Sequence, residues 1–228
     1  MDSNQIEIRN QAYENSEREL KEHEIIMLSL FKEYLGEKKI DILVYGVAAK
    51  PDDFYKAYTE CSPAGWKHVI HTELDGMFLC TQKVGQHMEE VKGGSIILLS
   101  SIYGVVGNDQ RIYEGSNLAD VYGDEKTQKP KKIYSHAAYA AVKGAYISMS
   151  RYLAAYWAED GIRVNSFSPA GVFRDHDPKF VEQLTYRIPL GRMAFAEEYK
   201  GPIVFLASDA SSFMTGANLI VDGGRTAW

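Results

Sequence analysis

Three short apolar segments rich in β-branched residues constrain the fold of this chain most strongly. They occupy Ile40–Ala48, Ser95–Leu99 and Ile162–Phe167, and stretches with helical periodicity separate them. A continuous apolar run is typical of a strand that is buried on both faces of a parallel sheet. Asn218–Val221 is a fourth segment of this kind near the end of the printed sequence.

Strands that alternate with helices predict an α/β protein with a doubly wound parallel sheet. Ser62 and Pro63 are expected to cap and open a helix over Ala64–Val91, because Ser accepts a hydrogen bond from an exposed backbone N–H and Pro suits the first helical position. Further helices are expected over Ser135–Tyr156 and Glu197–Leu206. A chain of 228 residues is expected to form a single domain over residues 1–228.

Charge and cysteine content exclude several classes of protein. A formal net charge of −6 argues against nucleic acid or an anionic membrane as the main partner. No apolar run approaches the roughly 20 residues that span a bilayer. Cys61 and Cys80 are too few for a disulfide framework, so we expect reduced thiols in a cytoplasmic protein. The sequence predicts no metal site.

The helix expected over Ser135–Tyr156 carries Tyr139 and Lys143. Residues four apart share one face of a helix, so the phenol and the ammonium are expected to be neighbours. A nearby cation favours phenolate, and the pKa of Tyr139 is therefore expected to fall below about 10, toward the range useful for proton transfer. Taken alone, the spacing is a weak motif, and an accidental pair is the alternative interpretation.

Polar residues follow the strands at the edge where ligands bind in such sheets. Ser101 follows the second predicted strand, and Pro169–Gly171 follow the third. In an open α/β sheet, ligands bind outside the carboxyl ends of the strands. The start of the helix that bears Tyr139 maps to the same edge, so we expect one site there.

Several segments together resemble the short-chain dehydrogenase/reductase family, in the family's order. They are IDILV, GSIILLSS, YAAVK, GIRVNSFSPAG, PLGRM and FLASDASSFMTGANLIVDGG, and they cover roughly Ile40 to the last residue. The resemblance implies a Rossmann-type sheet. It also implies NAD or NADP as cofactor and hydride transfer between that cofactor and an alcohol or carbonyl.

The resemblance also implies a role for each matching residue. Ser101 matches the serine that hydrogen-bonds the substrate oxygen, and Tyr139 matches the general acid/base. Lys143 matches the lysine that stabilises the phenolate and binds the nicotinamide ribose. The residues that match the family's cofactor-binding positions are Tyr139, Lys143, Pro169, Gly171 and Val172.

Glu73 stands where the family has the asparagine of its catalytic tetrad. A buried carboxylate there is expected to pair with Lys143, weaken its pull on Tyr139 and raise the phenol pKa. Alternatively, Glu73 is itself a base and a fourth catalytic residue. A third interpretation is an exposed surface glutamate on a rearranged helix.

A long polar stretch separates Ser101 from Tyr139, and we read residues 108–134 as an inserted loop on the substrate side. SIYGVVGNDQRIYEG and VDGGRTAW resemble family members associated with flagellin or surface-sugar modification. The resemblance implies a small-molecule substrate such as a sugar derivative. A polar, hydroxylated ligand or a solvated loop would each explain the polar residues of this stretch, Tyr103, Arg111, Tyr113 and Glu114.

The family's glycine-rich turn, G-x-x-x-G-x-G, does not occur before Ile40, and only 39 residues precede that strand. The turn binds the cofactor pyrophosphate through backbone N–H groups and a helix N-terminus. We therefore expect residues 1–39 to be an atypical segment. The sheet is then N-terminally truncated and lacks the family's first strand, first helix and second strand. Gln5–Arg9, Glu17–Leu35 or a second copy is expected to cover the edge of the Ile40–Ala48 strand.

Three functions follow as hypotheses. The one we favour is a protein of oxidoreductase descent that is impaired or inactive, a pseudoenzyme that binds cofactor weakly or not at all. It would persist as a homodimer or homotetramer through the helices over 65–91 and 138–156. The second is an active oxidoreductase on a sugar-like alcohol or ketone. The third is a non-redox isomerase or lyase that uses Tyr139, Lys143 and Glu73 as acid and base.

Overall fold

The computed structural model describes residues 39–118 and 132–228, so predictions for residues 1–38 and for 119–131 of the inserted loop lie outside it. A π-helical turn, Ile70–Asp75, joins the helix Pro63–Val69 to the helix Gly76–Val91. The strands are β1 (Ile42–Tyr45), β2 (Gly94–Leu99), β3 (Ile162–Pro169) and β4 (Asn218–Val221). The helices are α2 (Pro63–Val69), α3 (Gly76–Val91), α5 (Ala137–Tyr156), α6 (Pro178–Thr185) and α7 (Lys200–Ala207).

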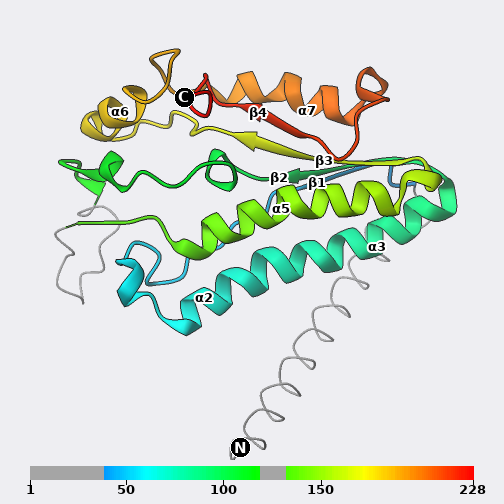
Figure 1. Ribbon diagram of the computed structural model, residues 1–228, viewed down its shortest axis with the longest axis horizontal. Helices are drawn as coiled ribbons and strands as arrows, with labels where there is room; N and C mark the ends of the chain where they lie inside the picture. Colours follow the sequence, from blue (N-terminus) through cyan, green and yellow to red (C-terminus); the bar gives the residue numbers. More distant parts are fainter. Residues whose placement is uncertain (1–38, 119–131) are drawn as a thin grey trace, which may run out of the picture.

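The four strands form one parallel sheet in the order β1-β2-β3-β4. Figure 1 shows α2, α3 and α5 on one face of the sheet and α7 on the other. The carboxyl ends of the strands point to the left of that view, where α6 lies. The predicted α/β fold with a parallel sheet is confirmed. No helix in the described ranges is long and apolar enough to cross a membrane.

β2 is an inner strand of the sheet and is buried on both faces, as its continuous apolar sequence predicts. Ile96 and Leu98 belong to the core beneath α3 and α5, and Ile97 belongs to the core beneath α7. All three side chains have no exposed surface. Burial of such side chains on both faces fixes the two helical layers relative to the sheet.

β1 differs from its prediction. Leu43 and Tyr45 pack against the core beneath α3, whereas Ile42 and Val44 are 48% and 45% exposed. Among the described residues only β2 pairs with this strand, and burial on both faces is not observed there. The segments expected to cover its edge, Gln5–Arg9 and Glu17–Leu35, lie outside the described residues.

Two helices begin with the caps that their sequences favour. The hydroxyl of Ser62 accepts a hydrogen bond of 2.9 Å from the backbone N–H of Gly65, and Pro63 opens α2 as predicted. The carboxylate of Asp177 accepts bonds from the backbone N–H groups of Lys179 and Phe180 at the start of α6. α6 was not expected from the sequence. With the short helix Gln110–Tyr113, it forms a separate small core beside the carboxyl ends of the strands.

Candidate active site

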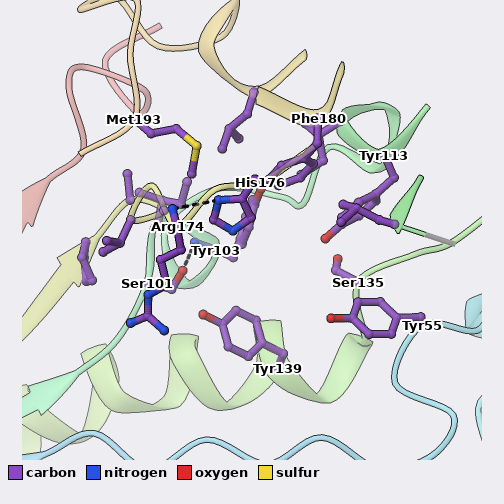
Figure 2. A pocket seen from close by; sticks show the side chains of 18 of the residues that line it. Tyr55, Ser101, Tyr103, Tyr113, Ser135, Tyr139, Arg174, His176, Phe180 and Met193 are labelled. Carbon is purple, nitrogen blue, oxygen red and sulfur yellow. Dashed lines mark hydrogen bonds between the residues drawn. The ribbon is translucent and has the colours of Figure 1, made fainter. Parts of the chain in front are cut away.

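A cleft of about 450 Å³ opens at the carboxyl edge of the sheet. Ser101 contributes from the end of β2, Tyr139 from the first turn of α5, and Phe180 from α6 (Figure 2). The predicted site residues that line the cleft are Ser101, Tyr139, Pro169, Gly171 and Val172. The topology thus brings together the candidates that the sequence places after different strands.

Hydrogen bonds fix Ser101 between β2 and α5. The neighbouring Ser100 hydroxyl donates to the backbone oxygen of Lys143 at 2.7 Å, which ties the end of the strand to the helix. The Ser101 hydroxyl accepts a bond of 3.2 Å from the backbone N–H of Tyr103. Its own proton can therefore be donated on the cleft side, to the oxygen of Tyr139 or to a substrate oxygen.

Burial raises the pKa of Tyr139 above its ordinary value, and the charge of Glu73 adds to this, while a hydrogen bond with Ser101 opposes it. The expectation that the pKa of Tyr139 falls is therefore wrong, whereas the rise expected for a buried Glu73 paired with Lys143 is observed. The ammonium lies 5.4 Å from the centre of the Tyr139 ring, but it is also paired with a carboxylate. The phenol is consequently protonated at neutral pH.

Lys143 is buried beneath the cleft, with 5% of its side chain exposed. Its ammonium lies 3.1 Å from a carboxylate oxygen of Glu73 and donates to the backbone oxygen of Leu99 at 3.3 Å. The ion pair expected for a buried Glu73 is present, and the surface interpretation of Glu73 is wrong, since that residue is fully buried. Burial lowers the pKa of Lys143, and Glu73 opposes this change.

The π-helical turn holds Glu73 in place. One carboxylate oxygen accepts a 3.0 Å bond from the backbone N–H of Ala49, and the other faces Lys143. The backbone oxygen of Glu73 accepts bonds of 3.0 Å from the hydroxyls of both Tyr45 and Tyr146. π-Helical turns are frequent at functional sites because they redirect backbone groups. Glu73 does not line the cleft, so any action on a substrate would pass through Lys143.

The stretch between Ser101 and Tyr139 contributes some of the residues that its sequence suggested. Tyr103 and Tyr113 line the cleft, and burial raises the pKa of Tyr103 to about 12. Arg111 instead binds Asp109 at 2.8 Å, outside the cleft. Glu114 pairs with Lys132 at the surface, at 3.3 Å. The last two residues do not contact the cavity, so their predicted ligand role finds no support.

Sequence reasoning missed several residues of the cleft. Lys50 follows β1, while Arg174 and His176 follow β3. Each lies a few residues beyond the carboxyl end of a strand. That position was itself a usable signal, because loops at this edge of a parallel sheet form ligand sites.

The nicotinamide side of a dinucleotide fits these residues. Pro169, Gly171 and Val172 form a largely apolar wall of the cleft, beside the Tyr139 phenol. A Cβ atom added at Gly171 would lie 3.2 Å from the side chain of Met193, so this part of the wall has little room for a larger residue. Within residues 39–118 and 132–228, no glycine-rich turn leads from a strand into a helix to receive a pyrophosphate.

Comparisons with known proteins agree with this geometry. The sequence profile described as "short chain dehydrogenase" matches residues 17–118, and the one described as "Enoyl-(Acyl carrier protein) reductase" matches residues 127–226. An NADP-dependent mannitol dehydrogenase of Alternaria alternata is 30% identical over 95% of this chain and 72% of its own length. The chain spans between 50% and 72% of the length of the curated relatives it matches.

Two solved structures are similar over most of the chain. A short-chain dehydrogenase from Leptospira borgpetersenii with bound NAD+ is 32% identical, with a TM-score of 0.71 over 91% of this chain and 72% of that one. A gluconate 5-dehydrogenase from Burkholderia cenocepacia in complex with NADP and tartrate is 28% identical, with a TM-score of 0.70 over 88% of this chain and 69% of that one. The chain therefore belongs to the short-chain dehydrogenase/reductase family.

Proposed function

We propose that this chain carries the catalytic part of an NAD(P)-dependent oxidoreductase that interconverts a secondary hydroxyl and a ketone on a polyol or a sugar acid. One observation supports this most directly: Ser101 and Tyr139 line the same cleft, and the ammonium of Lys143 lies next to the Tyr139 ring. The sequence alone favours an impaired enzyme, but the similar mannitol and gluconate dehydrogenases support the alternative, an active oxidoreductase.

The chain's own groups would act on the proton of the substrate hydroxyl. The Ser101 hydroxyl donates to the substrate oxygen and holds it against Tyr139. The Tyr139 phenolate takes the hydroxyl proton during oxidation and returns it during reduction. Lys143 stabilises the phenolate through its charge. When bound, the nicotinamide cofactor accepts or supplies the hydride.

The residues that would hold the nicotinamide half of the cofactor are Tyr139, Lys143, Pro169, Gly171 and Val172. An ammonium has three N–H donors, of which the Glu73 and Leu99 oxygens take two, so one is left for a ribose hydroxyl. Glu73 acts in this proposal as a positioning residue. It fixes the Lys143 ammonium and contributes to the raised pKa of Tyr139.

The cleft suits a hydroxylated carbon chain. Hydroxyl groups that both donate and accept hydrogen bonds alternate on its walls with apolar surfaces. Figure 2 shows Tyr55, Tyr113 and Ser135 together on one side of the cavity and Met193 on the opposite side. Polar groups of this kind would read the hydroxyls of the substrate, while the apolar surfaces pack against its carbon chain. The kinship to surface-sugar modification proteins stays a prediction.

The proposal includes assembly into a homo-oligomer and a cytoplasmic location. The oligomer is supported by an apolar surface on the outer sides of α3 and α5, where Phe78, Tyr152 and Tyr156 are 51%, 62% and 63% exposed. Tyr152 and Tyr156 stack on each other, with ring centres 6.3 Å apart. Exposed aromatic side chains in this number favour burial against a second copy.

A direct assay tests the proposed function. The purified chain is incubated with NAD+ or NADP+ and a panel of polyols and sugar acids, and formation of reduced nicotinamide is followed by absorbance. We expect turnover of at least one substrate, and its loss in Ser101→Ala, because the substrate oxygen then loses its donor. Turnover that persists unchanged in Ser101→Ala would contradict the proposed site.

A further inference from the structure

The cleft is positively charged although the chain as a whole carries a formal net charge of −6. Among its described lining residues, none is Asp or Glu, whereas Lys50 and Arg174 are both cationic. A neutral polyol gains less from such a charge than an anionic substrate does. The hydroxyl of a polyol can accept one hydrogen bond from a cation, whereas an anionic oxygen adds the attraction between two opposite charges.

Arg174 is one of the two cationic side chains among the described residues that line the cleft. Figure 2 shows its guanidinium reaching into the cavity toward Ser101 and Tyr139. Within the described ranges it has no carboxylate partner, unlike Arg111, Arg187 and Arg192. A planar guanidinium presents paired N–H donors that match the two oxygens of a carboxylate.

The loop that carries Arg174 is held in place. The backbone N–H of Phe173 donates to the oxygen of Ala194 at 2.9 Å. Asp175 adopts a φ of 48°, a left-handed conformation that Asp tolerates better than most residues. That turn lets the backbone N–H of Arg174 donate to Nδ1 of His176 at 3.2 Å.

This bond defines what His176 offers to a ligand. Since Nδ1 accepts a hydrogen bond, the proton of the neutral imidazole resides on Nε2, which is then a donor. The ring also packs against Phe180, with centres 5.5 Å apart, which restrains its orientation. Arg174 and His176 therefore present donors to the cleft from one short loop, and the described lining residues add no carboxylate to compete for them.

We infer that Arg174, assisted by His176, binds the carboxylate of a hydroxy-acid substrate, so that sugar acids are preferred over neutral polyols. This inference rests on the proposed function for the identity of the reacting hydroxyl, but the binding step can be tested without turnover. The same oxyanion chemistry occurs in the phosphates of a dinucleotide, and the experiment separates the two sources.

The test compares D-gluconate with D-glucitol, which differ only in whether one terminal carbon is a carboxylate or a hydroxymethyl group. Binding of each to the whole chain is measured by calorimetry without cofactor. We expect gluconate to bind about tenfold more tightly or better. In Arg174→Gln this preference disappears, and in Arg174→Lys, which keeps the charge but loses the fork, part of it returns.

Arg111→Gln is the matched control, since it removes one positive charge near the cleft without touching the lining. It should keep the preference for gluconate. Gluconate binding no tighter than that of glucitol in the unaltered chain, including no binding of either, would overturn the inference. So would an Arg174→Gln variant that keeps the preference but binds NADH more weakly, because the anion would then be a cofactor phosphate.

The outcomes also separate this inference from the proposed function. If the chain oxidises neutral polyols and Arg174→Gln does not change the rate, the proposed oxidoreductase activity is supported and the carboxylate site at Arg174 is contradicted. If the preference for gluconate depends on Arg174 but no hydride transfer occurs, the carboxylate site is supported and the proposed oxidoreductase activity is contradicted.

Discussion

At the scale of single residues, the account depends on the hydroxyl of Tyr139. Tyr139→Phe removes the acid/base group and leaves the ring, so we expect the turnover rate to fall by about 10³-fold with little change in unfolding midpoint. The measurement is steady-state turnover together with thermal unfolding. Tyr186→Phe, at a side chain that is 85% exposed, should change neither. An active Tyr139→Phe variant would remove Tyr139 from the mechanism.

Glu73 gives a prediction about pH. Its charge raises the pKa of Tyr139, and burial is the larger cause of that rise. Because the phenolate is the base in oxidation, the oxidation rate should increase as pH rises toward the phenol pKa. Glu73→Gln removes the charge, so the midpoint of the increase should move to lower pH.

The same variant leaves the buried Lys143 without its counter-ion, and we expect a loss of about 3 kcal/mol in the free energy of unfolding. pH–rate profiles and urea unfolding measure the two effects separately, with Glu90→Gln on the surface of α3 as control. A lower stability with an unmoved pH profile would show that Glu73 is only structural.

The sequence could identify the residues whose spacing or position carries chemistry. Tyr139 and Lys143 are four apart on a helix, and Ser101 follows a buried strand. Arg174 and His176 lie in a loop without periodicity, where direction is set by backbone turns such as that at Asp175. The raised pKa of Tyr139 also required the structure, since it depends mainly on how deeply the ring is buried.

At the scale of elements, the turn after β2 must fit closely against α5. A side chain at Gly104 would lie 2.6 Å from the backbone oxygen of Lys143, whereas one at Gly107 would contact nothing within 4 Å. Gly104→Ala should therefore push Ser101 away from Tyr139 and lower turnover by about 100-fold, while Gly107→Ala should not. Equal activity of the two variants, measured by turnover under saturating substrate, would contradict the close fit.

An ion pair joins the stretch between Ser101 and Tyr139 to the segment that follows α6. Asp109 accepts a 2.6 Å bond from Arg187, and both side chains are largely buried. Hydrogen bonds from Arg111 are the main reason why the pKa of Asp109 lies well below its ordinary value. Burial opposes this change, and the hydrogen bond and charge of Arg187 add to it. Asp109→Asn should lower the free energy of unfolding at pH 7 by about 2 kcal/mol.

The sign of the pH dependence follows from the lowered pKa. A carboxylate with a depressed pKa in the folded state stabilises the protein above its unfolded pKa, and this is lost as pH falls through the folded value. The difference in urea unfolding between the unaltered chain and the Asp109→Asn variant should therefore shrink below about pH 4. A difference that is constant from about pH 7 to about pH 3 would show that charge is not involved.

The elements that the sequence predicts best are the buried strands. β4 has the predicted bounds, Asn218–Val221, and β2 begins one residue before its prediction, because a continuous apolar run leaves little choice of boundary. α6 is only Pro178–Thr185, too short for a clear periodic pattern, although Asp177 and Pro178 are a recognisable start. The half-exposed β1 shows that an apolar sequence does not by itself establish burial on two faces.

At the scale of the whole molecule, we expect two or more copies of this chain to associate through the outer sides of α3 and α5. We expect sedimentation velocity to show a dimer or tetramer, and Phe78→Glu with Tyr152→Glu to shift it toward monomer, because charges oppose burial of that surface. Retained secondary structure by circular dichroism is the control. A monomer in the unaltered chain would contradict the proposed assembly.

The central claim is that this cleft moves a hydride and a proton together, and one labelling measurement tests it. A polyol or sugar acid with deuterium on its carbon atoms is incubated with the chain and NAD+ or NADP+, and the products are analysed by mass spectrometry. The account predicts deuterium in the reduced nicotinamide for the unaltered chain and none for Tyr139→Phe. Loss of deuterium to water without reduction of the cofactor, or no reaction of any label, would contradict it.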